Sequence, residues 1–276
     1  MSDPRSSVAP VRTTTALAAR SGFRIHAVTC RDDHTGWSGP ESRGRFGFVL
    51  VRRGRFRWSS DGRVVDVDTT VGYVSVPGAE ERFAHPAGGD VCTSIEVGPE
   101  LWRGAVGPAL YVDARVDLAH SRLLTAVRGG DVDYAVADEL LGLLVAASGA
   151  PVLGGSRDGT MLADARAAIL TEDPGGLLPL ADRLGVSPYR LSRAFPRELG
   201  VTVTQYRNRV RVGRAIDRIA DGERDLAALA VELGYADQAH LSRVVRTQVG
   251  RTPGALRALL QGSSRPTRTA ARDCTE

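Results

Sequence analysis

Residues 177–200, LLPLADRLGVSPYRLSRAFPRELG, and residues 225–250, DLAALAVELGYADQAHLSRVVRTQVG, follow one plan. Each segment begins with apolar residues at helical spacing around a small alanine, passes through Leu-Gly, and then carries Leu-Ser-Arg in a second helical stretch. Each segment ends on a glycine, which suits the residue just after a helix. The repeated plan predicts two pairs of short helices, each pair joined by a tight turn.

The turn in each pair has the chemistry that a sharp crossing of two helices requires. Gly185 and Gly234 can adopt the positive φ that a turn of three or four residues often needs. Ser187 and Asp237 are good N-cap residues for the second helix, and Pro188 falls at the first helical position, where its missing N–H costs nothing. These features predict two helix-turn-helix units.

A long helical stretch lies between the units. In VTVTQYRNRVRVGRAIDRIADG (201–222), the inner face is formed by Tyr206, Val210, Ala215, Ile216 and Ile219. About 20 residues at ~1.5 Å each give a helix of roughly 30 Å, and major-groove entries on one face of DNA are ~34 Å apart. The spacer therefore predicts two recognition helices placed in successive major grooves.

Positive charge is concentrated in the same part of the chain. The 276 residues carry 36 basic and 32 acidic side chains, a formal net charge of +4, and every basic side chain is Arg. Residues 183–257 hold 14 Arg and 7 acidic residues, whereas residues 1–159 hold 18 Arg and 19 acidic residues. A basic field on one part of a chain is typical of nucleic-acid binding, although Arg-rich helices are often only solvated faces.

These segments resemble the C-terminal signature of the AraC/XylS family of transcription regulators. The resemblance rests on VSPYRLSRAFPRELG, QYRNRVRVGRA and LAVELGYADQAHLSRVVRTQVGRTPGALR, which ends in the pattern Gly250, Thr252, Pro253 and Arg257. It implies a seven-helix domain whose first helix lies near 160–171, preceded by a cupin-like domain that binds an effector. Double-stranded DNA is the implied partner, and RNA polymerase is a further candidate.

The resemblance assigns the outward positions of both recognition helices to DNA. They are Tyr189, Ser192 and Arg193 on the first helix, and Gln238, Ala239, Ser242 and Arg243 on the second. Arg193 and Arg243 suit a guanine edge, and Gln238 suits an adenine edge. Positions better placed for phosphates are Arg190, His240 and Arg246. For each residue the alternative is an ion pair within the protein or a solvated side chain.

Three residues depart from the family pattern. Val245 stands where Phe is usual and Leu256 where an aromatic residue is common, which predicts a smaller core in the second unit. Pro196 lies inside the first recognition helix and removes a backbone hydrogen bond, so a kink or an earlier helix end after Phe195 is expected.

The N-terminal half has the texture of β-structure. Short alternating segments follow one another between residues 23 and 97, with a tight turn at Arg53-Gly54 and a hairpin signal at Asp61-Gly62. They predict an antiparallel barrel or sandwich, and the resemblance favours a cupin-like barrel. The predicted fold class is therefore α+β multidomain, with an antiparallel β-barrel and trailing helices followed by an all-α domain.

The predicted domain plan has five parts. A flexible tail (1–22) precedes a cupin-like sensing and dimerisation domain (23–148), a linker (149–159), the DNA-binding domain (160–261) and a disordered tail (262–276). Within 117–148 one broad apolar stripe contains Tyr134, Ala137, Leu140, Leu141, Leu144 and Val145. Packing on the protein's own barrel and packing on a second copy explain the stripe equally well and can coexist; we expect a homodimer through 117–148.

The effector pocket is the least determined feature of the sequence. Candidate lining residues are Trp37, Phe48, Trp58 and His85. A regulator without an effector, whose barrel only dimerises or binds a protein partner, is an open alternative.

Enzymatic alternatives find little support in the sequence. The histidines are dispersed and form no His-x-His pair, which argues against a cupin-type metalloenzyme. No catalytic residue, metal or cofactor is expected. Cys30, Cys92 and Cys274 are too sparse for a disulfide framework. A thiol-based sensor would require Cys30 and Cys92 to meet and one of them to be a thiolate.

The sequence also lacks the marks of export. No apolar stretch is long enough to span a bilayer, and MSDPRSSVAP does not have the layout of a signal peptide. The expected location is the cytoplasm, with no membrane partner.

Overall fold

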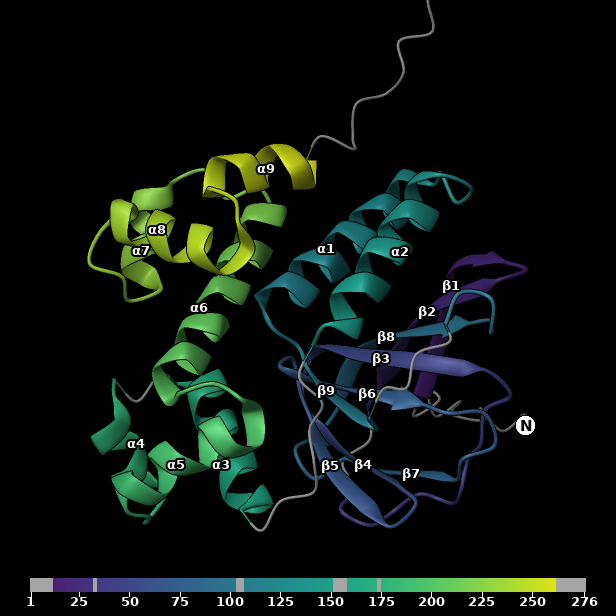
Figure 1. The fold of residues 1–276 in the computed structure, drawn as a ribbon, viewed down its shortest axis with the longest axis horizontal. Helices are drawn as coiled ribbons and strands as arrows, with labels where there is room; N and C mark the ends of the chain where they lie inside the picture. Colours follow the sequence, from purple (N-terminus) through teal and green to yellow (C-terminus); the bar gives the residue numbers. More distant parts are fainter. Residues whose placement is uncertain (1–11, 32–33, 103–106, 151–157, 173–174, 262–276) are drawn as a thin grey trace, which may run out of the picture.

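The computed structural model describes residues 12–31, 34–102, 107–150, 158–172 and 175–261 (Figure 1). The strands are β1 (Arg12–Arg20), β2 (Phe23–Cys30), β3 (Phe46–Arg53), β4 (Phe56–Ser60), β5 (Arg63–Val67), β6 (Val71–Ser75), β7 (Glu81–Ala84), β8 (Asp90–Val97) and β9 (Ala109–Tyr111). The helices are α1 (Ala114–Gly129), α2 (Ala135–Ser148), α3 (Gly159–Thr171), α4 (Leu177–Arg183), α5 (Pro188–Leu199), α6 (Val203–Ala220), α7 (Leu226–Glu232), α8 (Gln238–Val249) and α9 (Pro253–Gln261). We call residues 12–150 the β domain and residues 158–261 the helical domain.

The β domain contains two antiparallel sheets. One has six strands in the order β1-β2-β8-β3-β6-β9, and the other has three in the order β5-β4-β7. A shared core lies between them and is formed by Val49, Val51, Phe56, Trp58, Val67, Tyr73, Phe83 and Cys92. The predicted α+β class with an antiparallel N-terminal domain is confirmed, but the pairings among the described residues form two sheets rather than one closed barrel.

The tight turn and the hairpin signal of the sequence are both confirmed, the turn as a connection between the two sheets. Gly54 turns the chain between β3 and β4 with φ +79°, and Asp61 and Gly62 join β4 to β5 with φ 49° and 72°. The alternating segments expected between residues 23 and 97 form strands, among them β6 and β8. The short strands β7 and β9 were not predicted, because four and three residues are too few to establish a period.

The predicted flexible tail at 1–22 is wrong for residues 12–20. These residues form β1, which pairs with β2 from Arg12 opposite Cys30 to Arg20 opposite Phe23. The stretch begins RTTT, and β-branched threonine favours strand geometry. Ala18 is buried in the core between the six-stranded sheet and helices α1 and α2, so it anchors the strand to the domain. Residues 1–11 lie outside the described residues, as do the central part of the predicted linker (151–157) and the predicted C-terminal tail (262–276).

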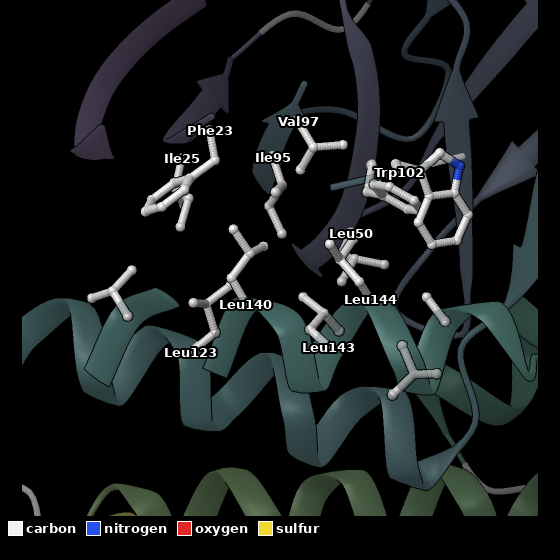
Figure 2. Close-up of a cluster of buried hydrophobic side chains, with 14 of the residues drawn as sticks. Phe23, Ile25, Leu50, Ile95, Val97, Trp102, Leu123, Leu140, Leu143 and Leu144 are labelled. Carbon is white, nitrogen blue, oxygen red and sulfur yellow. The ribbon is translucent and has the colours of Figure 1, made fainter. Parts of the chain in front are cut away.

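Helices α1 and α2 cover the six-stranded sheet. Figure 2 shows Leu123 of α1 and Leu140, Leu143 and Leu144 of α2 facing Ile95 and its neighbours on the strands. The packing of the apolar stripe on its own domain is therefore confirmed for Leu140 and Leu144. The side chains of Tyr134, Leu141 and Val145 in the same stripe are 77%, 47% and 73% exposed. Contact between these residues and a second copy stays a prediction.

The described part of the helical domain consists of seven helices, α3 to α9, as expected from the resemblance. It has two hydrophobic cores, and α6 contributes to both: Tyr206 and Val210 pack with α3, α4 and α5, whereas Ile216 and Ile219 pack with α7, α8 and α9. Val245 and Leu256 are fully buried in the second core.

Pro196 was expected to kink or end the first recognition helix, but the helix continues beyond it. Helix α5 continues to Leu199, and Gly200 closes it in the left-handed conformation with φ 71°. Phe195 and Leu199 are buried on either side of the proline, so tertiary packing holds the last turn in place.

The two domains share buried surface along α6 and α1 (Figure 1). Val71, Ala109 and Tyr111 of the β domain belong to the first helical core, and Leu118 of α1 belongs to the second. The described helices lack the combination of length and apolar character that a membrane crossing requires.

Candidate nucleic-acid interface and inter-sheet cavity

The first helix-turn-helix unit consists of α4 and α5. Gly185 adopts φ +64° in the turn, and the Val186 N–H donates to the Ala181 carbonyl at 3.0 Å. The Ser187 hydroxyl caps α5 by accepting a hydrogen bond from the Arg190 N–H at 3.2 Å. The turn therefore has the conformation and the cap that its sequence predicts.

The second unit, α7 and α8, repeats this geometry. Gly234 has φ +74°, and the Tyr235 N–H donates to the Ala230 carbonyl at 2.8 Å, the counterpart of the bond in the first turn. The Asp237 carboxylate caps α8 by accepting from the His240 N–H at 2.6 Å. The duplication seen in the sequence is thus a duplication of backbone hydrogen bonds as well.

The residues predicted to contact DNA are all accessible. Eight of these side chains are exposed: Tyr189, Arg190, Ser192 and Arg193 on α5, and Gln238, Ala239, Arg243 and Arg246 on α8. The side chains of His240 and Ser242 are half-buried. The opposite faces carry Leu191 and Leu241, which are fully buried. The inward and outward faces are therefore as expected, and the DNA contacts themselves stay a prediction.

Several outward side chains of α5 are paired with other groups of the protein. Arg190 and Arg197 both pair with Asp158 at the start of α3, and their hydrogen bonds hold the pKa of that carboxyl below its usual value. The Arg193 guanidinium lies over the Tyr189 ring, 5.3 Å from its centroid, and donates to its hydroxyl. The side chains of Arg190, Arg193 and Arg197 are exposed, so phosphate or base groups can compete for them.

The α8 surface is arranged around the turn that precedes it. The His240 ring packs edge-on against Tyr235 at 5.3 Å. Arg211 of α6 stacks over the same tyrosine at 5.5 Å and donates to the Gly234 carbonyl at 3.0 Å. Within the described residues, Arg243 forms no ion pair and projects from an exposed position.

Helix α6 sets the spacing of the two units. Its 18 residues correspond to ~27 Å, slightly less than the sequence suggested. A capping box fixes its start: the Gln205 N–H donates to the Thr202 hydroxyl at 3.2 Å, and the Thr202 N–H donates to the Gln205 side chain at 2.8 Å. A continuous, capped helix holds the units at a constant separation.

Buried ion pairs join the helical domain to the β domain. Arg166 of α3 lies 2.8 Å from Asp68, which follows β5. Arg209 of α6 donates to the Val112 carbonyl at 2.7 Å and lies 3.1 Å from Asp117 of α1. These groups are close to a cleft of about 630 Å³ that residues of both domains line. The sequence does not reveal these pairs, because their partners are about 100 positions apart.

A hydroxyl pair strengthens the same contact. Thr70, between β5 and β6, lies 2.9 Å from the Tyr206 hydroxyl of α6. Burial raises the pKa of Tyr206, so its phenol stays neutral. Asp68 accepts hydrogen bonds from the Thr70 N–H at 2.7 Å and from its hydroxyl at 2.6 Å, which orients the loop toward α6.

A separate cavity of about 130 Å³ lies within the β domain. Its lining includes Arg12, Cys30, Arg43, Tyr73, His85, Asp90 and Cys92. Arg43 donates to the Ser94 hydroxyl at 2.8 Å, and Cys92 donates to Asp90 Oδ2 at 2.8 Å. Burial and the neighbouring carboxylate raise the pKa of the Cys92 thiol, which disfavours a thiolate at this position.

The cavity contains one of the four predicted effector residues, His85. Trp58 is buried behind the lining and stacks on Tyr73 at 4.7 Å. Phe48 faces the helices and packs against Trp102 at 4.7 Å. Trp37 is 39% exposed, beneath the guanidinium of Arg57. These three residues lie away from the lining because the alternation of a strand does not indicate which of its faces holds a cavity.

The strands also bring the two cysteines into one cavity. Cys30 pairs with Asp90, and Cys92 pairs with Val28 two positions along, so both thiols lie on the same face of the sheet. Neither forms a disulfide within the described residues. Both thiols therefore line one cavity, while the raised pKa of Cys92 disfavours its thiolate; a redox function stays a prediction.

Comparisons with known proteins agree on the helical domain. A sequence model described as a helix-turn-helix domain matches residues 180–259. The arabinose operon regulatory proteins of Salmonella typhimurium and Escherichia coli are each 30% identical to this chain over 79 residues, which is 29% of this chain. The match spans 28% and 27% of the length of these relatives.

Similar solved structures include regulators. The C-terminal domain of AraT, a response regulator from Geobacillus stearothermophilus, is 27% identical, with 37% of this chain and 87% of that chain covered and a TM-score of 0.35. Unsaturated fatty acid bound ToxT from Vibrio cholerae is 8% identical, with 88% and 97% covered and a TM-score of 0.38. The sequence motifs, the duplicated geometry and the matched relatives together show that this chain carries a helix-turn-helix domain of the AraC type at its C-terminal end.

Proposed function

We propose that this chain is a sequence-specific DNA-binding transcription regulator whose two readers are α5 and α8. The observation that carries the proposal is the duplicated turn: both units have the same glycine conformation, the same backbone bond across the turn and a side-chain N-cap on the second helix. A capped helix of 18 residues joins them. This arrangement suits a protein that places two recognition helices in successive major grooves.

Within the two readers we assign separate tasks. Arg193 and Arg243 point outward from fully packed helices and can form bidentate hydrogen bonds with guanine, whereas Gln238 can pair with adenine. Arg190 and Arg246 supply affinity through phosphates. Since Arg190 is already paired with Asp158, its phosphate contact replaces that ion pair.

The test is the selection of bound sequences from a random DNA pool, followed by affinity measurements on the selected site. We expect two sequence elements about one helical turn apart. Arg193→Ala and Arg243→Ala should each relax the preference at one element and weaken binding by about 1–3 kcal/mol. Arg63→Ala, an exposed arginine on β5 of the other domain, is the matched control. Unchanged specificity in the double variant would refute the assignment of the readers.

The β domain supplies regulation in this proposal. The inter-sheet cavity of about 130 Å³ is below the usual size of ligand sites, so its effector is small. Arg12 and Arg43 line it together with Glu41 and Asp90, and the two arginines can donate to an effector with acceptor oxygens. The alternative is a β domain without an effector, which only dimerises or binds a protein.

A short path connects the cavity to α6. Tyr73 lines the cavity, and Thr70, three residues before it, contacts the Tyr206 hydroxyl of α6. A Cβ at Gly72 would lie 2.8 Å from the Val49 carbonyl oxygen, so β6 fits closely against β3 and has little room to move by itself. An effector that displaces Tyr73 would then shift the population of docked helical domains.

The coupling is tested by the effect of Tyr206→Phe on ligand-dependent DNA binding. Small oxyanions and carboxylic acids are screened by the change in DNA affinity that they produce. We expect at least one of them to alter the wild-type affinity and Tyr206→Phe to reduce that change while DNA binding itself persists. A complete screen without any response would favour the β domain that only dimerises or binds a protein.

We further propose that the chain dimerises through α2. Leu141 and Val145 of α2 are exposed, as is Tyr134 just before the helix, whereas Leu140 and Leu144 are buried against the sheet. An apolar row on a helix that is already docked on its own domain is suited to packing against its copy.

A further inference from the structure

We propose that Cys30, His85 and Asp90 form a binding site for one divalent transition-metal ion of the zinc class within the β domain. Each residue offers one ligand atom, and these atoms all lie within 4.8 Å of one another. The three residues are 8%, 8% and 5% exposed. Thiolate, imidazole and carboxylate are the ligand types that zinc uses in proteins. This site goes beyond DNA binding and beyond the proposed effector.

The sheet register brings two of the ligands together. Cys30 is the last residue of β2 and Asp90 is the first residue of β8, and the two are direct partners in the ladder. Directly opposed residues on one face have neighbouring side chains. This pairing is set by the backbone, so it holds whether or not a metal is bound.

A tight turn supplies the third ligand. His85 follows β7, and the Gly88 N–H donates to the His85 carbonyl at 3.1 Å before the chain enters β8. Gly89 passes so close to β2 that a Cβ would lie 2.4 Å from the Cys30 carbonyl oxygen. Glycine at this position lets the turn close onto the strand, and His85 is thereby held against Asp90.

Two buried polar atoms of the cluster lack an ordinary partner. His85 Nδ1 and Asp90 Oδ1 have no hydrogen-bond partner among the described atoms. His85 Nε2 lies 3.0 Å from Asp90 Oδ1, but the pair does not have the geometry of a hydrogen bond. Buried polar groups are normally satisfied, and an ion bound between the two side chains would account for the unpartnered Asp90 oxygen.

Cys92 has a supporting position. Its thiol donates to Asp90 Oδ2 at 2.8 Å, which leaves Oδ1 directed toward His85. Residues that orient metal ligands in this way are a regular part of metal sites. Cys92 is therefore a positioning residue, not a ligand, in this proposal.

Three ligands leave one coordination position open. All three residues line the cavity of about 130 Å³, so water or an oxygen of a small ligand can complete a tetrahedral set. The competing explanation is a His85–Asp90 ion pair beside a neutral thiol. The two explanations differ in metal content and in the spectrum of a cobalt derivative.

The first experiment measures metal in the purified, tag-free full chain after exposure to excess Zn²⁺ and desalting. We expect one zinc per chain in the wild type and loss of that zinc in Cys30→Ser, His85→Gln and Asp90→Asn. Cys92→Ala should retain the metal with an affinity that is about 10–100-fold weaker, as for a supporting residue. Cys274→Ser, a thiol remote in sequence, is the matched control and should bind like the wild type.

The second experiment replaces zinc with Co²⁺ and records absorption. We expect a thiolate-to-cobalt charge-transfer band in the wild type and in Cys274→Ser, and none in Cys30→Ser. The wild-type spectrum decides even where a variant fails to fold. Substoichiometric zinc in the wild type, a cobalt spectrum without the thiolate band, or full zinc retention by Cys30→Ser would each overturn the site. DNA binding is measured separately, so failure of the metal site leaves the proposed function intact.

Discussion

Replacement of Asp68 with asparagine should weaken the contact between the two domains. Asp68 is 4% exposed and Arg166 is 5% exposed, and their charged atoms are 2.8 Å apart. At an effective dielectric constant of about 20, the attraction over this distance is about 6 kcal/mol. Arg166 keeps a hydrogen bond to the Asp66 carbonyl, which offsets part of the loss. Breaking a buried pair costs about 3–5 kcal/mol, and we expect about 3 kcal/mol for Asp68→Asn.

The tryptophans allow the two domains to be followed separately. All three, Trp37, Trp58 and Trp102, lie in the β domain. Urea unfolding is therefore followed by tryptophan fluorescence, which reports the β domain, and by far-ultraviolet circular dichroism, which is dominated by helices; most helical residues belong to α3–α9 of the helical domain. We expect the two transitions to coincide in the wild type and to separate in Asp68→Asn, because the helical domain then unfolds without its neighbour.

The control is the exposed ion pair between Arg183 and Glu172, whose side chains are 47% and 74% exposed. Glu172→Gln should leave both transitions in place, since solvent screens such a pair. The double variant Asp68→Asn with Arg166→Met removes both buried charges and should recover much of the lost stability. A loss below about 1 kcal/mol in Asp68→Asn, with coincident transitions, would refute the reasoning.

Three further predictions concern pH, a helix cap and the dimer. Burial lowers the pKa of His120 to about 4, so between pH 6.5 and 4 the unfolded chain binds more protons than the folded chain. The free energy of unfolding should therefore fall by up to about 3 kcal/mol as the pH drops across that window. Urea unfolding measured at several pH values should show a flatter pH profile for His120→Gln than for the wild type. Desolvation by neighbouring groups and the Asp117 carboxylate raise the pKa of Asp217 to about 6, with the opposite effect on stability. Because much of its side chain stays in contact with solvent, its contribution is smaller. Asp237→Ala removes the cap of α8 and should cost about 1 kcal/mol in thermal unfolding, with weaker DNA binding; an unchanged melting profile would contradict the role of the cap. Val145→Glu should yield a monomer in sedimentation, whereas Val231→Glu, equally exposed on α7, should not change the assembly state.

The helical domain could be predicted closely because its signals are local. Gly185 and Gly234 adopt the positive φ that their turns require, and Ser187 and Asp237 cap the helices that follow them. Each of these effects acts over three or four residues. The exception is Pro196, whose local effect is overcome by the burial of the residues around it.

The β domain was predicted less well, since strand pairing joins distant segments. The segment at 12–20 was predicted to be part of a flexible tail, because its sequence alone does not reveal that β2 is its pairing partner. Three of the four effector candidates lie outside the cavity lining, which instead gathers residues such as Arg12, Arg43 and Asp90 from separate strands and loops.

Local periodicity and capping in the sequence were enough to establish two helix-turn-helix units, the helix between them and the faces that look outward, because helices are formed by contacts three and four residues apart. Long-range pairing was needed for the rest. Cys30 meets His85 and Asp90 through the register of β2 with β8, and Arg209 reaches Val112 and Asp117 across the domain boundary. No period in the sequence encodes such meetings, since they depend on where whole strands and helices come to rest against one another.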